Sequence, residues 1–417
     1  MQLHAFTKSL PKIELHAHLN GSIRQQTLVE LASERNVSLP PKMMLHDAAQ
    51  TQQLHNDDIT NNNEEVSFWN THPRSLQDCF EVFEYIPKCV DDLVALRRIT
   101  EEVLMDAAED GVVYIELRTG PKCLLRRHHN DDDGGGEVAS KREYVETIIQ
   151  IMNEFERKER LRYEMECRAL EDNVVMMQQQ IVRLPLIPRL IISVDRAGTV
   201  EQADENINLA IDLFHKQQSL PPGQSKHIVG VELGGNPTRN NFTIFEASFE
   251  RARSAGLHVA IHIGEVPMKP HDERYNEAHA VINFRPDRLG HALTLSTSLI
   301  ELLEKNPIPI ECCPTSNTMT LDFALHHEGS LIDGIKMHPH LKEWVESNYP
   351  ISINTDDSGI FCTTMTKECL LISKVFELDE KKLSEIILDS VDHVFDDDIK
   401  TRLRNDIQSV VEMMKVA

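Results

Sequence analysis

The run Ile13-Glu14-Leu15-His16-Ala17-His18 opens a series of short, apolar, β-branched segments that alternate with longer helical patterns. Eight such segments can be placed, around Ile13–His18, Val112–Arg118, Leu190–Asp195, Ile228–Leu233, His258–Ile263, Arg288–His291, Ile308–Cys312 and Ile351–Thr355. Alternation of this kind predicts βα units and a parallel sheet. Eight units favour an α/β fold of the (β/α)8 TIM-barrel type, although a long doubly wound sheet would give a similar pattern.

Additional helical patterns interrupt and extend this series. They lie near Gln25–Arg35, Leu76–Tyr85 and Asp91–Asp110, and then near Lys367–Phe376, Glu380–Ser390 and Asp398–Lys415. We therefore expect a barrel with a helical insertion between strands 1 and 2 and extra C-terminal helices. No internal repeat or second core is evident, so residues 1–417 are expected to form one domain.

Residues 126–140 follow the second predicted strand and include three consecutive aspartates followed by three glycines. Such a segment has too little apolar surface to order itself. We expect a flexible loop on the active face of the barrel, either a lid over the site or a disordered connection.

The chain has 417 residues, of which 41% are hydrophobic, and a formal net charge of −24. An acidic surface repels polyanions, so a nucleic acid polymer is not expected as a partner. No apolar run is long enough to span a membrane, and the N-terminus lacks the pattern of a secretory signal. The cysteines form no Cys-x-x-Cys pair, which favours free thiols in a reducing compartment. We expect a cytoplasmic monomer that acts on a small molecule.

Candidate metal ligands lie at the ends of three predicted strands. His16 and His18 end the first strand and point to the same side, because they are two positions apart. His262 ends the fifth strand and Asp356 follows the eighth. Strand ends converge on one face of a (β/α)8 barrel. Imidazoles and a carboxylate without thiolates suit one catalytic zinc ion per chain, although iron, cobalt or manganese would accept the same ligands.

Acid–base candidates accompany these ligands. Glu265 lies three positions after His262, where its carboxyl could move a proton between water and substrate. His291 ends the sixth predicted strand, and Asp357 stands beside Asp356, free to bond to a substrate. The combination predicts a metal-dependent hydrolase.

The same residues occur in the order of the adenosine/AMP deaminase family, which the chain resembles over roughly residues 8–400. The resemblance rests on the motifs His16-Ala17-His18-Leu19-Asn20-Gly21-Ser22, Leu233-Gly234-Gly235-Asn236, His262-Ile263-Gly264-Glu265, Leu289-Gly290-His291 and Thr355-Asp356-Asp357. Within the family, the segments Leu10–Ser22 and Ser193-Val194-Asp195-Arg196 are most similar to the adenosine deaminase-like members, which act on N6-methyl-AMP.

The resemblance implies hydrolytic removal of the 6-amino or 6-alkylamino group from a purine nucleoside monophosphate, with N6-methyl-AMP and water giving IMP and methylamine. It implies that zinc is held by His16, His18, His262 and Asp356. Glu265 would protonate N1 and His291 would orient the attacking hydroxide. Asp357 would bond to N7, and the N–H of Gly235 would meet N3. The implied substrate contacts are His18, Asn20, Arg118, Thr119, Gly120, Pro121, Lys122, Asp195, Gly235 and Asp357.

The choice of a nucleotide depends on Asn20. The resemblance implies that adenosine deaminases hold an aspartate at this position, where it binds the ribose 5′-hydroxyl. A neutral amide can instead donate to a 5′-phosphate. Arg118, Lys122 and Arg196 could supply positive charge. Relatives carry histidine at the position of Pro87, threonine more often at that of Gly120, and arginine more often at that of Lys122. Lysine binds phosphate as a single point charge and lacks the paired, bidentate hydrogen bonds that an arginine guanidinium can make.

Other activities remain open from the sequence alone. Adenosine, adenine or AMP could be deaminated by the same chemistry. A dinuclear barrel hydrolase and a nucleotide-binding pseudoenzyme are more distant alternatives.

Overall fold

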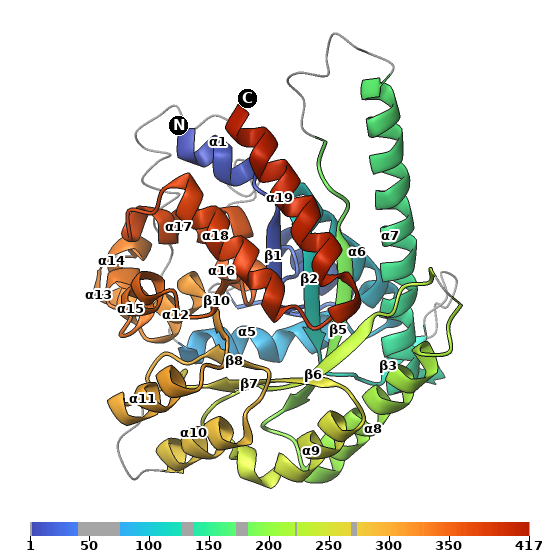
Figure 1. Ribbon diagram of the computed structural model, residues 1–417. Helices are drawn as coiled ribbons and strands as arrows, with labels where there is room; N and C mark the ends of the chain where they lie inside the picture. The colour runs from blue at the N-terminus through green and yellow to red at the C-terminus, as the bar shows by residue number, and fades with distance from the viewer. Residues whose placement is uncertain are drawn as a thin grey trace.

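The computed structural model describes residues 2–40, 76–126, 137–171, 182–221, 223–267, 273–327 and 329–416 (Figure 1). Eight strands form one sheet in which neighbours follow chain order and pair in parallel. The strands are β1 (Lys12–His18), β2 (Val112–Thr119), β5 (Ile187–Asp195), β6 (Ile228–Gly234), β7 (His258–Ile263), β8 (Arg288–His291), β9 (Ile310–Cys312) and β10 (Ile351–Ile353). All eight predicted strands are therefore present.

The sheet closes where the chain just after β10 meets β1. The backbone N–H of Asp356 donates to the carbonyl of His16 over 2.8 Å, and the N–H of His18 donates to the carbonyl of Asp356 over 2.8 Å. The Asn354 side chain accepts from the N–H of Leu15 at 2.9 Å. A doubly wound sheet would leave two free edges, so that alternative is wrong and the (β/α)8 barrel is confirmed.

Helices surround the barrel, and the predicted insertion and C-terminal helices are both present (Figure 1). The helices are α1 (Gln2–Ser9), α2 (Gln25–Glu34), α5 (Leu76–Cys89), α6 (Leu93–Glu109), α7 (Lys141–Glu171), α8 (Val200–Gln217), α9 (Glu246–Ser254), α10 (Glu273–Phe284), α11 (Thr297–Lys305), α12 (Pro314–Thr320), α13 (Phe323–His326), α14 (Leu331–Lys336), α15 (Leu341–Ser347), α16 (Ser358–Phe361), α17 (Met365–Val375), α18 (Glu380–Ser390) and α19 (Lys400–Val416). None of these helices combines the length and apolar character needed to cross a membrane, in the part of the chain described.

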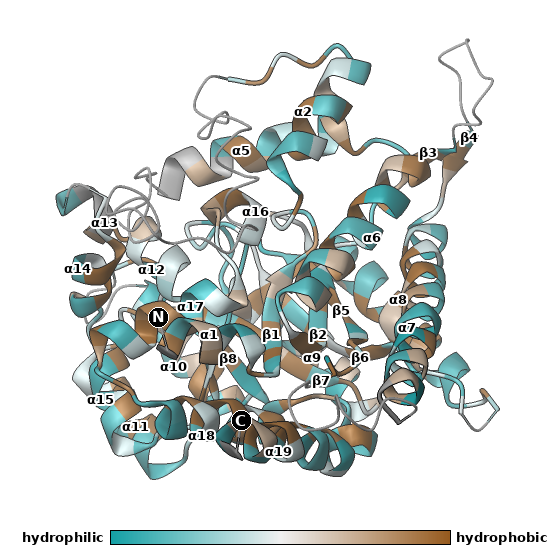
Figure 2. Ribbon diagram, turned by 90° about the horizontal axis from the view of Figure 1, so that it is seen from above, coloured by the Kyte–Doolittle hydropathy of each residue, from teal (hydrophilic) through white to brown (hydrophobic). Residues whose placement is uncertain are grey.

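The predicted flexible loop at 126–140 has ordered ends. Strands β3 (Leu124–Arg126) and β4 (Glu137–Ala139) pair antiparallel, and this hairpin lies on the same side of the barrel as α6 and α7 (Figure 2). The prediction chiefly concerned residues 127–136, which lie outside the described residues. Residues 41–75, which hold most of the polar stretch between α2 and α5, also lie outside them.

The barrel interior contains charged side chains where such barrels usually hold branched apolar ones. Arg118 and Arg288 are buried, together with Glu116, Glu232 and Glu311. Arg118 donates to Glu232 at 2.9 Å and also to Glu311, while Arg288 donates to Glu311 at 2.6 Å and also to Glu116. Each buried charge thus has an opposite charge in contact, which is the condition for keeping it ionised in a low dielectric.

Replacing Arg288 by Met should destabilise the protein by about 3–5 kcal/mol, because Glu116 and Glu311 would each lose a buried counter-charge. The free energy of unfolding, measured by urea denaturation, checks this. Arg404→Met is the matched control, since Arg404 pairs at 2.7 Å with the exposed Asp392 and should cost less than about 1 kcal/mol. Equal losses in the two variants would contradict the account of the interior.

Candidate active site

A cluster of polar side chains gathers at the carboxyl ends of β1 and β7 and just after β10. The Nε2 atoms of His16 and His18 lie 3.3 and 3.4 Å from Oδ1 of Asp356. Nε2 of His18 lies 3.3 Å from Nε2 of His262. His16, His262 and Asp356 are buried and His18 is partly exposed. The structure thus brings together the four residues predicted as metal ligands.

The backbone at Asp356 is strained, with a φ of +63°. A left-handed conformation is unfavourable for a residue other than glycine, and it persists only where the surroundings impose it. Here the two backbone hydrogen bonds to β1 fix the residue. His291, at the end of β8, has a φ of +59°. Strain of this kind at two adjacent site positions is typical of a functional site.

Carboxylates lie behind the imidazoles. Nδ1 of His16 is 2.8 Å from Oε2 of Glu311, and Glu232 lies 3.6 and 3.5 Å from Nδ1 of His18 and His262. Partners of this kind orient a histidine ligand and raise its basicity. They direct the three Nε2 atoms towards one point, which Asp356 also faces.

The residues present fit a divalent metal ion. Nε2 of His16 is buried and has no hydrogen-bond partner among the described residues, although it faces three other donor atoms. Burial and the neighbouring imidazoles hold the pKa of His262 well below its usual range, so this ring is neutral, the form that binds metals. Although burial opposes it, contact with His16 lowers the pKa of Asp356, which keeps this carboxylate ionised. Nitrogen and oxygen donors of this kind suit zinc and similar ions.

Two carboxyl groups whose pKa shifts in the opposite direction to that of Asp356 complete the centre, the buried Asp357 and the partly buried Glu265. Burial raises the pKa of Glu265, against the opposing effect of His291, whose Nε2 lies 3.6 Å from Oε1 of Glu265. Burial and the carboxylate of Asp356 also raise the pKa of Asp357. The geometry thus places two carboxyl groups of raised pKa beside a carboxylate of lowered pKa, and environments that separate pKa values in this way are typical of acid–base catalysis.

Two glycines of the sequence motifs are required by close packing. A Cβ at Gly21 would collide with the carboxylate of Asp357, and a Cβ at Gly235 would collide with that of Asp195. Gly235 also has a φ of +88°, which its residue type tolerates. These glycines let Asp357 and Asp195 approach the mouth of the barrel.

Several predicted substrate contacts gather around the ends of β1, β2 and β5. The hydroxyl of Tyr144 lies 2.7 Å from that of Thr119, and the partly exposed Asn20 follows β1. Lys122 interacts with Asp195, which partly offsets the lowering of its pKa by burial. Gly120 and Pro121 connect these two groups in the chain, with Gly120 next to the backbone of β5.

Arg118 takes a different place from the one predicted. Its guanidinium is fully buried in the barrel interior, where it donates to Glu232, Glu311 and the carbonyl of Leu15. Arg118 is therefore a counter-ion of the site, and its full burial keeps it away from a phosphate at the barrel mouth. Arg196 is likewise engaged by Glu277 and by the carbonyl of His262, at 2.6 Å for the carbonyl. Pro87 is exposed on α5.

Among the supporting residues, Glu232, Glu311 and Tyr144 escaped sequence reasoning, whereas Ser316 and Asn317 read in the sequence only as part of the pocket floor. Ser316 donates to Oδ2 of Asp356 at 2.7 Å, and Asn317 contacts Nδ1 of His291 at 2.9 Å. A signal did exist for Glu232 and Glu311, because each is a charged residue inside an otherwise apolar strand run. Such a charge is costly unless it is paired.

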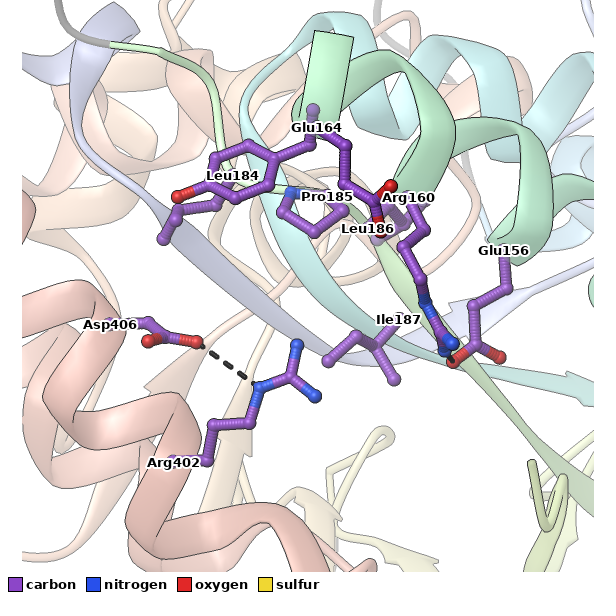
Figure 3. Close-up of a pocket in the computed structure, with 10 residues that line it drawn as sticks. Glu156, Arg160, Glu164, Leu184, Pro185, Leu186, Ile187, Arg402 and Asp406 are labelled. Carbon is purple, nitrogen blue, oxygen red and sulfur yellow. Dashed lines mark hydrogen bonds and ion pairs between the residues drawn. The ribbon is translucent and has the colours of Figure 1, made fainter. Parts of the chain in front are cut away.

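A separate cavity of about 420 Å³ lies at the opposite end of the barrel (Figure 3). It is bounded by Arg160 of α7, by Leu184–Ile187 before and at the start of β5, and by Arg402 of α19. None of the clustered imidazoles or carboxylates of the candidate site lines it. The cavity is therefore distinct from that site.

Imidazoles that converge with a carboxylate on one point, beside a carboxyl group of raised pKa at the carboxyl ends of a parallel barrel, define a hydrolase.

Comparison with known proteins specifies the family. The family model described as adenosine deaminase matches residues 11–410. An N6-mAMP deaminase of Arabidopsis thaliana is 31% identical over 400 residues, covering 95% of this chain and 96% of that protein. An adenosine deaminase-like protein of Drosophila melanogaster is 30% identical over 393 residues, covering 94% of each. The crystal structure of Arabidopsis ADAL complexed with IMP matches with a TM-score of 0.69 and 30% identity, covering 97% of this chain and 98% of that one. The chain belongs to the adenosine deaminase family, which confirms the prediction made from its motifs.

Substituting Glu311 by Gln should weaken zinc binding about 10- to 100-fold, because the His16 ring would lose the carboxylate that orients it. Competition between the protein and a chromogenic chelator measures this affinity. Glu301→Gln, at an exposed position of α11, is the control and should bind zinc as the wild type does. An unchanged affinity in Glu311→Gln would show that this carboxylate does not support the ligand.

Proposed function

We propose that the protein hydrolyses N6-methyl-AMP to IMP and methylamine. The observation that carries this proposal is the partly buried Glu265, whose pKa is raised, beside the histidine and aspartate cluster in a chain of the adenosine deaminase family. The relative named for N6-mAMP, together with the IMP complex of Arabidopsis ADAL, supports a nucleotide as the substrate.

The metal would be one zinc ion per chain, held by His16, His18, His262 and Asp356. When bound, zinc supplies Lewis-acid activation of water at neutral pH. Glu232 and Glu311 would keep the imidazoles oriented before any ion or substrate arrives.

Glu265 would donate a proton to N1 of the purine. Its raised pKa leaves the carboxyl protonated at higher pH than an exposed glutamic acid, so the proton is available when C6 is attacked. Protonation of N1 withdraws electrons from C6 and favours addition of water there. The Glu265 carboxylate then takes up one proton of the attacking water. Transfer of the remaining proton from the C6 hydroxyl to the amine nitrogen lets the C6–N6 bond break, which releases methylamine and leaves the C6 carbonyl of IMP.

His291 would orient the attacking water. Its Nδ1 lies 2.9 Å from Oδ1 of Asn317, an acceptor, which fixes the hydrogen on Nδ1 and leaves Nε2 as an acceptor. A water molecule that donates to Nε2 would lie beside Glu265, since this atom is 3.6 Å from the carboxyl.

Asp357 and Gly235 would hold the base. A protonated Asp357 can donate to N7, which carries a lone pair, and its raised pKa favours that form. The backbone N–H of Gly235 would donate to N3. Together with Glu265 at N1, these contacts would bind three ring nitrogens, which fixes the position of C6.

The 5′-phosphate would lie near Asn20, Thr119 and Lys122, with Gly120, Pro121 and Asp195 forming the surrounding wall. A neutral Asn20 can donate to an anion, and the Lys122 ammonium supplies charge. Arg118 has no part in this contact, because it is used inside the barrel.

Glu265→Gln should lower kcat/KM for N6-methyl-AMP by about 10²- to 10⁴-fold, because the amide cannot donate a carboxylic proton. Mass spectrometry of IMP formation by the zinc-loaded enzyme measures the rate. Glu273→Gln, exposed at the start of α10, is the control and should retain full activity. An unchanged rate in the Glu265 variant would contradict the mechanism.

Asn20→Asp should weaken IMP binding by about tenfold or more while inosine binding changes little, because a new carboxylate repels the phosphate. Calorimetric titration of each ligand into the zinc-loaded protein gives both constants. A wild type that releases inosine from adenosine faster than IMP from N6-methyl-AMP would overturn the choice of a nucleotide substrate.

A further inference from the structure

We propose that Glu14 is a positioning residue that fixes the two arms of the metal centre relative to each other, the histidines of β1 and Asp356 after β10. The inference rests on the proposed function, because it concerns the residues that would hold zinc. Glu14 lies in β1, two positions before His16, and only 2% of it is exposed. None of the catalytic steps uses its carboxyl group.

The predicted ligands come from opposite ends of the strand order. His16 and His18 belong to β1, whereas Asp356 follows β10. Where these segments meet, a backbone bridge pairs Ala17 with Asp356. Its two hydrogen bonds run from Asp356 to His16 and from His18 to Asp356. The position of one arm relative to the other is therefore set at this junction.

The Glu14 carboxyl group spans the junction. Its Oε1 accepts the backbone N–H of His16 at 3.0 Å. Its Oε2 accepts both the backbone N–H of Thr355, at 3.0 Å, and the Thr355 hydroxyl, at 2.8 Å. His16 is itself a predicted ligand, and Thr355 directly precedes Asp356. One buried side chain therefore holds the backbone of both arms.

Strand β1 is irregular at the same place. Between Glu14 and Ala17 it advances by three residues while the paired segment of β2 advances by two, which is a β-bulge at Leu15 and His16. Backbone groups in a bulge leave the regular ladder and take other partners. The N–H of Leu15 donates to the Asn354 side chain at 2.9 Å, and that of His16 donates to Glu14. Because bulges beside active sites re-aim side chains, we infer that Glu14 holds the backbone conformation that directs His16.

Glutamate suits this position because both of its oxygens can accept hydrogen bonds. Each oxygen of Glu14 meets a backbone N–H, from His16 on one side and Thr355 on the other. Glutamine would offer one carbonyl oxygen and one NH2 group, so one of the two N–H groups would face a second donor. A buried donor without an acceptor is costly, and the backbone responds by moving. Whichever way the amide turns, one arm loses its anchor.

The Kd for zinc of the full-length protein, measured by competition with a chromogenic chelator, tests the proposal. We expect Glu14→Gln to bind zinc about 10- to 100-fold more weakly, the loss typical when a group that orients a metal ligand is replaced. Thermal unfolding without metal shows that each variant is folded.

Asp92→Asn is the matched control for a change of a buried carboxylate to an amide. Asp92 accepts the backbone N–H of Ala95 at 2.7 Å and pairs with Arg35 at 2.8 Å, but it does so at the start of α6 in the outer layer. Its replacement should lower thermal stability and leave the zinc Kd within about twofold of wild type.

Thr355→Val is a milder variant that perturbs the same contact. It removes the hydroxyl that donates to Glu14 and leaves the backbone N–H in place. The zinc Kd should rise about three- to fivefold, the loss typical of one hydrogen bond. Thr100→Val is its control, because the buried Thr100 hydroxyl donates to the carbonyl of Leu96 within α6, at 2.7 Å.

A folded Glu14→Gln protein with the zinc Kd of the wild type would overturn the role of Glu14. If that variant does not fold, an unchanged Kd in Thr355→Val would overturn it. Equal losses of zinc affinity in the controls would also do so, because any loosened buried contact would then weaken the site. A wild type that binds no zinc would instead contradict the metal centre of the proposed function, and the positioning role with it.

Discussion

The buried guanidinium of Arg118 is the interaction on which the rest of the site depends. It bonds to Glu232 and Glu311, and these carboxylates stand behind the imidazoles of His16, His18 and His262. Without this shared cation, two neighbouring carboxylates would be buried with less opposite charge. Burial and mutual repulsion would then raise their pKa values and favour the protonated forms. A protonated carboxyl would orient the imidazoles less strongly. Arg118 therefore keeps Glu232 and Glu311 ionised, and these two carboxylates in turn orient the three imidazoles.

The sequence allowed the barrel and the central cluster to be predicted, because both depend on short-range patterns. Alternation of strand and helix patterns gave all eight strands, and the rule that active residues lie at strand ends singled out His262 and Asp356. Arg118 shows where this reasoning ends. It lies one residue before the end of β2, and whether a side chain faces the interior or the helices changes with each position along a strand. Arg118 faces the interior and Thr119 faces α7, which the pattern of the segment alone does not reveal.

The surroundings of the site were harder to predict because they join distant segments. Strand β3 has three residues and no pattern of its own, and it forms by pairing with β4 and by the contact of Arg126 with Glu143. The long helix α7 begins at Lys141, so its first turn lies within reach of β2. Tyr144 in that turn reads as an ordinary core aromatic in the sequence. Its hydroxyl contact with Thr119 of β2 becomes apparent only when the two segments are placed side by side.

Asp356 and Asp357 show how one turn separates two chemical roles. They are adjacent in sequence and both are buried, so desolvation alone would raise the pKa of each. The left-handed conformation at Asp356 directs its carboxylate towards His16 and His18, which outweigh desolvation and keep it ionised. The Asp357 carboxyl instead packs against Gly21 and faces other acids, so nothing offsets its desolvation. The difference in pKa therefore arises from the direction of the backbone and not from the residue type, and it gives the site an ionised carboxylate suited to a metal ion and a group suited to donate a hydrogen bond from the same pair.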